Sequence, residues 1–292
     1  MQLSIIIVNW NVKNLIKKSI LSILNKIKNL NFEIIVIDNN SRDGSKEMLL
    51  ELQKQYIKLK IIFNNENKGF AKANNQGLKI ANGKYILFLN PDTEIKESNF
   101  KKIFDYMEAN SKVGACTARL FYNNKKQQPN VKKDPTLLSQ LLILLKFHHF
   151  IKTKALKKYL AKDFDYSKKA EVKQIMGAFI FTRKSLMEEL KGWSEDYFVW
   201  WEDLDLCQRI RKAGKKIIYL PIGYIIHYEG KSFAQQFSYK KQKIFNKGMI
   251  TYWKKFYPLW QTIILEMFCP LSLFLSFCVQ LLKTKPRSQS KI

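Results

Sequence analysis

The sequence predicts an α/β fold built on a doubly wound, mostly parallel β-sheet, and two observations support this prediction. First, short apolar runs rich in β-branched residues alternate with segments of helical periodicity over the first third of the chain. Second, polar residues follow these runs abruptly, as expected where buried strands end at a ligand crevice. Right-handed crossovers between consecutive parallel strands turn such an alternation into a doubly wound sheet.

The individual elements are placed by their patterns. The apolar runs predict strands at residues 3–8, 32–38, 59–63, 83–89 and 175–183. Apolar residues at helical spacing predict helices at residues 15–27, 45–55 and 71–81. Asp43 is expected to be the N-cap of the second helix. The polar loops after the first, second and fourth strands should open at the same edge of the sheet.

The composition is that of a globular protein with a large excess of positive charge. Hydrophobic residues make up 46% of the chain, which excludes a disordered protein. The net charge of +27 favours an anionic partner such as nucleic acid, anionic lipid or a phosphorylated substrate, unless a general bias toward Lys and Asn accounts for it. The cysteines lack metal-type spacing and the first residues do not form a signal peptide, so a cytoplasmic protein is expected.

A carboxylate stands just beyond the strand predicted at 83–89, in the sequence "FLNPDTE". Mg²⁺ prefers oxygen ligands and typically binds one or two carboxylates together with substrate phosphates, and Asp92 is placed for that role. The alternative is a plain turn, because Asn90, Pro91 and Asp92 are residues that initiate turns. His227 follows a late apolar strand, where a histidine is usually structural, but it could face the same crevice as Asp92.

Two further loops have the chemistry of a nucleotide site. Asp38 ends the strand predicted at 32–38, where its carboxylate can accept hydrogen bonds from a ribose or a base. The stretch "NENKGFAKANNQG" combines Lys68, Gly69 and several amides, which suits a diphosphate, although it is neither a Walker loop nor a GxGxxG fingerprint.

The stretch "YFVWWEDLDLCQRI" crowds three carboxylates behind two tryptophans. Acids in the first turn of a helix and bases in the last are favourable, and this explains Asp205 without any function. It does not explain the aromatic residues. Aromatic faces beside carboxylates suit a sugar, so Trp200 and Trp201 are candidates for a sugar-facing wall and Glu202 for a contact to an acceptor; Asp203 lies between them and the helix.

Taken together and in order, these stretches resemble glycosyltransferase family 2 of the GT-A fold, and most closely its bacterial rhamnosyltransferase-type branch. The resemblance covers about residues 3–232 and rests on "SIIIVNWN", "VIDNNSRDGS", "NKGFAKANNQG", "YILFLNPDTE", "MGAFIFTRKSL", "FVWWEDLDLCQRIRKAG" and "HYEGKS". It implies an inverting transfer of a sugar from a nucleotide-diphosphate donor to an acceptor hydroxyl, with Mg²⁺ or Mn²⁺ as cofactor.

The resemblance also implies roles for single residues. The family's Asp-x-Asp motif reads Asn90-Pro91-Asp92 here, so Asp92 keeps the metal role while Asn90 can only form hydrogen bonds in the donor site. His227 would complete the metal ligands and Asp203 would be the general base. The donor site would be lined by Asn9, Asp38, Lys68 and Gly69.

The C-terminal part of the chain has a different composition. The apolar run over 259–282 is long enough to cross a bilayer, but Glu266 and Pro270 interrupt it. A single crossing would also separate a catalytic domain that needs cytosolic nucleotide sugar from a basic end that prefers the cytoplasm. We therefore favour attachment to an anionic membrane surface, supported by the basic aromatic stretch 239–257, over a span.

These patterns predict a catalytic domain over 1–235 and a membrane-associating helical tail over 236–292. They place the chain on the cytoplasmic side of the cell membrane, as a peripheral or monotopic protein. This location suits a lipid-linked or polysaccharide acceptor. Residues 137–151 are either a second apolar contact or a core helix.

Other functions are weaker alternatives. A nucleotidyltransferase would need a Gly- and Arg-rich N-terminal loop, which "NWNVKNL" is not. A nucleic-acid-binding protein would have to use the charge alone, because no recognised motif of that kind is present, and no nucleic-acid partner is expected. An inactive homologue acting as a scaffold is disfavoured by the intact set of Asp92, Asp203 and His227.

Overall fold

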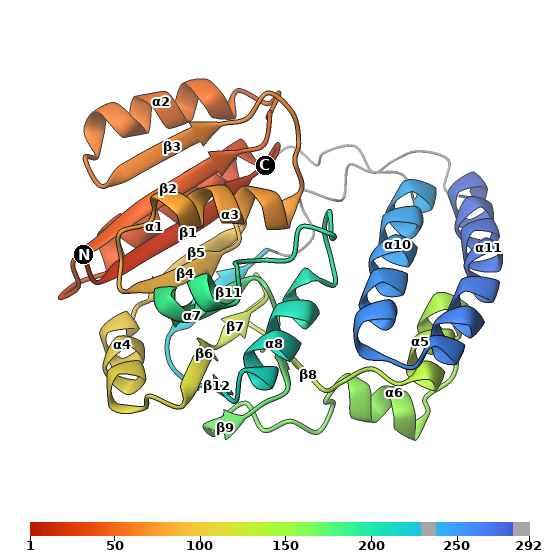
Figure 1. Ribbon diagram of the computed structural model, residues 1–292. Helices are drawn as coiled ribbons and strands as arrows, with labels where there is room; N and C mark the ends of the chain where they lie inside the picture. Colours follow the sequence, from red (N-terminus) through yellow and green to blue (C-terminus); the bar gives the residue numbers. More distant parts are fainter. Residues whose placement is uncertain (229–237, 283–292) are drawn as a thin grey trace.

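An eight-stranded sheet of order β3-β2-β1-β4-β11-β6-β12-β9 forms the centre of the molecule (Figure 1). The computed structural model describes residues 1–228 and 238–282. The strands of this sheet are β1 (Leu3–Asn9), β2 (Phe32–Asp38), β3 (Leu59–Phe63), β4 (Tyr85–Leu89), β6 (Val113–Thr117), β9 (Ala170–Glu171), β11 (Phe179–Arg183) and β12 (Lys216–Tyr219). The predicted doubly wound, mostly parallel sheet is confirmed.

Parallel pairing dominates the first half of the sheet. β3, β2, β1 and β4 run in one direction, and the register places Asn9 opposite Asp38. β11 then pairs antiparallel with both β4 and β6. The strand predicted at 175–183 is in fact broken: β10 (Gln174–Ile175) belongs to a separate two-stranded sheet with β8 (Val131–Lys132). The break at 176–178 contains Gly177, whose N–H donates a hydrogen bond to Asp203.

Helices cover both faces of the sheet because its strands are apolar on both sides. Ile5 and Ile7 of β1 face one core, and Ile6 and Val8 face the other, as the alternation of side chains along a strand requires. One face is covered by α1 (Lys13–Lys26), α2 (Ser45–Gln55) and α4 (Phe100–Ala109). The other is covered by α3 (Phe70–Ile80), α7 (Lys184–Glu189) and α8 (Glu202–Lys212).

The prediction that Asp43 is the N-cap of α2 is wrong. Gly44, at φ 79°, is the N-cap, and no side chain caps this end. Asp43 instead accepts hydrogen bonds from the N–H of Ser45 at 3.1 Å and from the N–H of Lys13 at 2.7 Å. Its carboxylate therefore ties the loop after β2 to the start of α1.

A small second sheet connects distant parts of the sequence. β5 (Thr93–Glu97) pairs antiparallel with β13 (Tyr224–His227), and β13 pairs parallel with β7 (Leu120–Phe121). In this register His227 lies opposite Thr93. The pairing therefore brings the end of β13 to the loop that follows β4.

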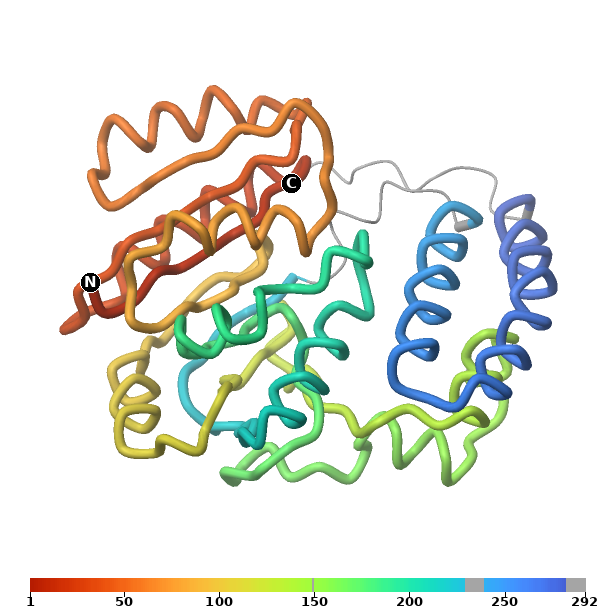
Figure 2. The backbone as a smooth tube through the Cα atoms, in the orientation of Figure 1, coloured from red at the N-terminus to blue at the C-terminus, as the bar shows by residue number. Residues whose placement is uncertain are grey.

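The last described helices form a hairpin that stands beside the sheet domain. Figures 1 and 2 show α10 (Ser238–Phe256) and α11 (Leu259–Leu282) side by side, with α5 (Leu137–Leu144) next to them. The segment after α5 contains the short 3-10 helix η1 (Phe147–His149) and α6 (Lys154–Tyr159). A third apolar core joins α5, α10 and α11 to the start of α8; it includes Leu144, Trp201, Leu204, Met249, Trp253 and Leu265.

This third core bears on the predicted division of the chain. The boundary between 235 and 236 and the basic end 283–292 lie outside the described residues, so the boundary stays a prediction. The two alternatives for 137–151, a core helix and an apolar contact, each describe part of the segment. α5 packs on α11 as a core helix, and the residues after it include exposed apolar side chains.

Close approach of α10 to the start of α8 depends on a glycine. A Cβ placed on Gly248 would lie 2.8 Å from Cδ1 of Trp201, which is closer than van der Waals contact. Trp201 is itself packed among Phe245, Tyr252 and Trp253 and has little freedom to move. Gly248 is therefore required by packing and not by backbone conformation.

We expect Gly248→Ala to destabilise the protein. In an unhindered helix the same change stabilises by about 1 kcal/mol. Here overpacking against Trp201 should lower the free energy of unfolding by roughly 1–2 kcal/mol, measured as a lower midpoint of thermal unfolding. Lys247→Ala, at the neighbouring exposed position of α10, is the matched control. A Gly248→Ala protein as stable as this control would contradict the packing account.

Candidate active site

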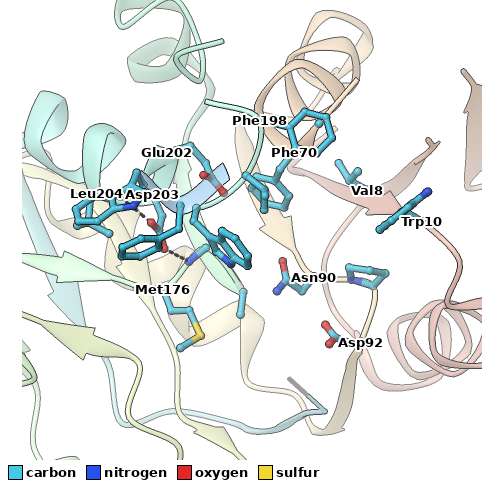
Figure 3. A pocket seen from close by; sticks show the side chains of 18 of the residues that line it. Val8, Trp10, Phe70, Asn90, Asp92, Met176, Phe198, Glu202, Asp203 and Leu204 are labelled. Atoms are coloured by element: carbon cyan, nitrogen blue, oxygen red, sulfur yellow. Dashed lines mark hydrogen bonds between the residues drawn. The ribbon is translucent and has the colours of Figure 1, made fainter. Parts of the chain in front are cut away.

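A cavity of about 560 Å³ opens beyond the carboxyl ends of β1, β2 and β4, where the sequence placed the ligand crevice. Its lining comes from parts of the chain that are far apart in sequence. The lining includes Trp10, Asn39, Gly69, Asn90, Asp92, Lys132, Gly177, Trp200, Trp201, Glu202, Asp203, His227 and Phe245. Figure 3 shows Glu202 and Asp203 on one side of this cavity and Asn90, Asp92 and Trp10 on another.

Asp92 and His227 meet at one corner of the cavity. The β5–β13 pairing places Oδ1 of Asp92 3.3 Å from Nε2 of His227, and both residues are almost fully buried. Nδ2 of Asn90 lies 3.2 Å from the same ring nitrogen. On the other side of the ring, Nδ1 lies 3.0 Å from Oε1 of Gln128. Three predicted site residues are thus brought together, with Gln128 behind them.

The hydrogen bonds of His227 suit a metal ligand. An amide oxygen can only accept, so Nδ1 carries the proton that is donated to Gln128, and the lone pair of Nε2 in the neutral ring faces the corner formed by Asn90 and Asp92. Metal-binding histidines are commonly held in this way by an acceptor on the second nitrogen. Nε2 and the Asp92 carboxylate are then two electron-rich groups 3.3 Å apart, an arrangement that a cation between them would stabilise.

The donor set is small. Among the described residues, no three His, Cys, Asp or Glu side chains are grouped as a metal site. Asp92 and His227 fit a divalent cation that takes its remaining ligands from water and from the phosphates of a substrate, as Mg²⁺ typically does. The residues present therefore fit the predicted metal, with a substrate completing the coordination.

Asp203 is presented to the cavity by an unusual turn. Trp200 and Trp201, which precede it, have φ angles of 63° and 70°, in the left-handed region that bulky residues rarely adopt. Such a conformation costs on the order of 1 kcal/mol per residue and persists only where the surroundings enforce it. It ends at the first turn of α8, so that Asp203 Oδ2 accepts a hydrogen bond from the N–H of Gly177 at 3.1 Å and Oδ1 from that of Leu204 at 2.9 Å (Figure 3).

The pKa values of the two adjacent carboxyl groups, Glu202 and Asp203, are both raised. Burial, and then the charge of Asp203, raise the pKa of Glu202 to about 8, and its Oε2 has no hydrogen-bond partner within the described parts of the chain. Burial also raises the pKa of Asp203, but the charge of Lys132 and the N–H of Gly177 oppose this rise. Two neighbouring carboxyl groups disfavour the doubly ionised state, and Lys132 and the N–H of Gly177 favour negative charge on Asp203.

The predicted donor residues divide into two groups. Gly69 lines the cavity at φ 82°, and a Cβ there would lie 2.5 Å from the carbonyl oxygen of Phe198, so only glycine fits. Asn9 donates to Asp38 Oδ2 at 2.7 Å, and both are buried behind the cavity lining. Lys68 is exposed and is not part of the lining. Direct donor contacts of Asn9, Asp38 and Lys68 stay predictions.

The predicted acceptor residues all reach the cavity, but they differ in character. Trp200 and Glu202 line it, and so does Trp201. Trp201 is only 4% exposed, because most of its ring packs in the third core. Its main contribution is therefore to fix the turn before Asp203, and Trp200 is the better candidate for a sugar-facing surface.

The helix-start explanation of Asp205 is incomplete. This carboxylate is fully buried and is bound by Arg209 at 2.5 Å, by the hydroxyl group of Tyr197 at 3.1 Å and by Lys255 at 3.2 Å. Lys255 belongs to α10, so Asp205 helps to attach the C-terminal hairpin to α8. Its role is structural, as predicted, but the physical reason is a buried ion pair.

Several residues that line the cavity or support its lining were not predicted from the sequence. Lys132 lies on the two-residue strand β8, which has no periodicity to reveal it. Gln128 is in an irregular segment, and Phe245 comes from α10, more than forty residues after Trp200. Trp10 directly follows β1, next to Asn9, and position alone would have found it.

The fold and this site are those of a glycosyltransferase, and comparison with known proteins identifies the family. The model of Glycosyl transferase family 2 matches residues 4–189, and the chain belongs to this family. It is a glycosyltransferase. It is 30% identical to Rhamnosyltransferase WbbL of Escherichia coli (strain K12) over 77% of this chain and 82% of that protein, whereas several other curated relatives are matched over less than half of their own length.

Solved structures confirm the GT-A fold. The mannosyltransferase PcManGT from Pyrobaculum calidifontis, in complex with GDP-Man and Mn²⁺, superposes with a TM-score of 0.56 at 15% identity, over 97% of this chain and 76% of that one. S. aureus TarS in complex with UDP gives a TM-score of 0.55 at 16% identity, over 86% of this chain and 66% of that chain. At these identities the likeness concerns the fold.

Lys132 provides a test of the electrostatics around Asp203. We expect Lys132→Met to move the acid limb of kcat/KM for donor hydrolysis, in which water replaces the acceptor, to higher pH. The sign follows from the removed cation: the pKa of Asp203 rises further, so its ionised form is lost earlier as the pH falls. Lys133→Met, at an exposed neighbouring position, should leave the profile unchanged. Identical profiles for the two variants would contradict this role.

Proposed function

We propose that this glycosyltransferase moves a sugar from a nucleotide-diphosphate donor to an acceptor hydroxyl, with inversion at the anomeric carbon and with help from Mg²⁺ or Mn²⁺. The observation that carries the proposal is the placement of Asp203 and of the Asp92–His227 pair on separate sides of one cavity. An in-line displacement needs this arrangement, with the acceptor and its base on one side and the leaving diphosphate on the other.

The chain's own residues supply the acid–base and positioning chemistry. Asp203 takes the proton of the acceptor hydroxyl as the new C–O bond forms and the bond to the diphosphate oxygen breaks, a contribution of typically 10²- to 10⁴-fold. Its hydrogen bonds to the N–H of Gly177 and Leu204 hold the carboxylate in place. Glu202 lies beside it, and its protonated form can donate a hydrogen bond to the acceptor. A divalent cation held by Asp92 and His227 would neutralise charge on the leaving diphosphate.

The names of related proteins support the finer parts of the proposal. The relative in E. coli is a rhamnosyltransferase, and structural neighbours bind UDP or GDP-Man, two of them with Mn²⁺. We therefore propose rhamnose, or another hexose or deoxyhexose, as the transferred sugar. The acceptor would be a lipid-linked or cell-surface polysaccharide intermediate, reached at the cytoplasmic side of the cell membrane.

Asp203→Asn tests the base. The amide is nearly isosteric but cannot accept the acceptor proton, so we expect donor hydrolysis and transfer to fall by at least about 10²-fold. Nucleotide affinity measured by calorimetry should stay close to that of the wild type, because the donor corner is unchanged. Asp163→Asn, at an exposed carboxylate that does not line the cavity, is the control. Turnover like the wild type in Asp203→Asn would refute the assignment.

Asp92→Ala tests the metal corner. Without this carboxylate, UDP or GDP should bind with an affinity that no longer increases when Mn²⁺ is added, because the cation that joins diphosphate and protein is lost. Asp105→Ala, at an exposed position of α4, is the control for removing a carboxylate outside the cavity. If Mn²⁺ strengthens nucleotide binding equally in wild type and Asp92→Ala, the cation is held elsewhere.

A further inference from the structure

Helix α11 presents two faces of different chemistry. Toward α10 it buries small polar side chains: Ser272 Oγ accepts a hydrogen bond from Asn246 Nδ2 at 2.7 Å, and Ser276 Oγ donates to Gln242 Oε1 at 3.2 Å. Away from α10 it exposes large apolar side chains that recur every three or four residues. These include Trp260, Ile263, Met267, Leu271, Phe274 and Leu281, with Met267 73% and Phe274 61% exposed.

This apolar face is too large to be incidental. Leu259–Leu281 is long and apolar enough to cross a membrane, yet only 22% of its most apolar 18 residues is buried inside the protein. A core helix of a soluble protein would bury most of such a surface. The face is therefore expected to be covered by something outside the described chain.

The charges beside the face indicate what covers it. Lys243, Lys247 and Lys254 are exposed and lie at spacings of four and seven on α10, so they form one stripe along that helix. Lys254 pairs with Glu266 of α11 at 2.8 Å, which places the stripe along the edge of the apolar face. An apolar face bordered by lysines is the arrangement of helices that lie on anionic membranes.

The packing of α11 opposes a transmembrane orientation. A span would either carry α10 with its lysines into the hydrocarbon or remove α10 and leave Ser272 and Ser276 facing lipid. The first change places charged side chains in hydrocarbon, and the second breaks the hydrogen bonds that join the two helices. An orientation parallel to the membrane keeps every one of these contacts.

We propose that α11 lies in the plane of an anionic bilayer, with its exposed apolar face at the acyl-chain boundary and the lysine stripe of α10 at the lipid phosphates. The segment after α5 supplies a neighbouring contact, because α5 packs on α11. In this segment Phe147 and Ile151 are about half exposed and Phe150 is 83% exposed. Lys152 and Lys154, both exposed, follow directly.

This orientation places the cavity close to the lipid surface, a consequence that rests on the proposed function. α10 carries the lysine stripe and also contributes Phe245, which lines the cavity and contacts the ring of Trp201 at 5.3 Å. One helix therefore separates the membrane-binding face from the site where the acceptor is expected. A lipid-linked acceptor could enter the cavity while its lipid remains in the bilayer.

Flotation of the full chain with phosphatidylcholine vesicles, with and without phosphatidylglycerol, tests the proposal. We expect wild-type protein to bind the anionic vesicles, and Met267→Asp/Phe274→Asp to bind at least about tenfold more weakly. Ile57→Asp, at an apolar residue 98% exposed on the sheet domain, should bind like the wild type. Lys243→Glu/Lys247→Glu should remove most of the preference for phosphatidylglycerol.

Other measurements separate the remaining outcomes. Unchanged calorimetric binding of UDP or GDP would show that Met267→Asp/Phe274→Asp is folded; nucleotide binding and vesicle binding can fail separately, so the membrane contact and the proposed function are tested independently. Wild-type binding by Met267→Asp/Phe274→Asp would overturn the proposal. So would a vesicle-free dimer that this double variant dissociates, or vesicle-bound protein that resists alkaline carbonate extraction as a span does.

Discussion

The antiparallel pairing of β5 with β13 is the interaction on which the site depends. Asp92 and His227 are separated by well over one hundred residues, and this short pairing places His227 opposite Thr93, one residue from Asp92. Both side chains are then buried at the cavity, with Gln128 fixing the imidazole from behind. The parallel strands supply the remaining parts, since their carboxyl ends bring Trp10, Asn39 and Asn90 to the same edge. A cation site made of so few protein ligands leaves coordination positions for a substrate, which suits an enzyme better than a structural metal.

On the opposite side of the cavity, several features lower the stability of the fold and serve the candidate site. A buried carboxyl group, Glu202, and a half-buried one, Asp203, are adjacent at the start of α8, and the two tryptophans before them adopt left-handed backbone conformations. Each of these features disfavours the folded state. They persist because the third core encloses Trp201, and because Gly177 and Lys132 stabilise the charge of Asp203. The C-terminal hairpin therefore has two roles: α10 supports the turn that presents Asp203, and α11 carries the face that we assign to the membrane.

Much of the fold was predictable because buried parallel strands leave uninterrupted apolar runs, and the polar residues that follow them mark the ligand edge. Asn90 and Asp92 were singled out in this way, and so was His227, which follows a late apolar strand. Asp203 was singled out among carboxylates behind two tryptophans, and its role as base came from the resemblance to the family. Lys132 could not be found, because β8 has two residues and no periodicity. The partner of Asp205 was also hidden, since Lys255 lies fifty residues away on another helix. The strand predicted at 175–183 is interrupted at Gly177, where the N–H donates a hydrogen bond to Asp203. This contact in the site overrides the apolar pattern that predicts a continuous strand.

Direct binding of a divalent cation by His227 beside Asp92 connects the fold to the proposed chemistry, and pulsed EPR of bound Mn²⁺ measures it. In the presence of UDP or GDP, the wild-type protein is predicted to show electron-spin-echo modulation from a directly coordinated imidazole nitrogen. That modulation should disappear in His227→Gln while Mn²⁺ and the nucleotide still bind through Asp92. Mn²⁺ bound with nucleotide but without nitrogen coupling in the wild type, or a coupling that persists in His227→Gln, would contradict the arrangement.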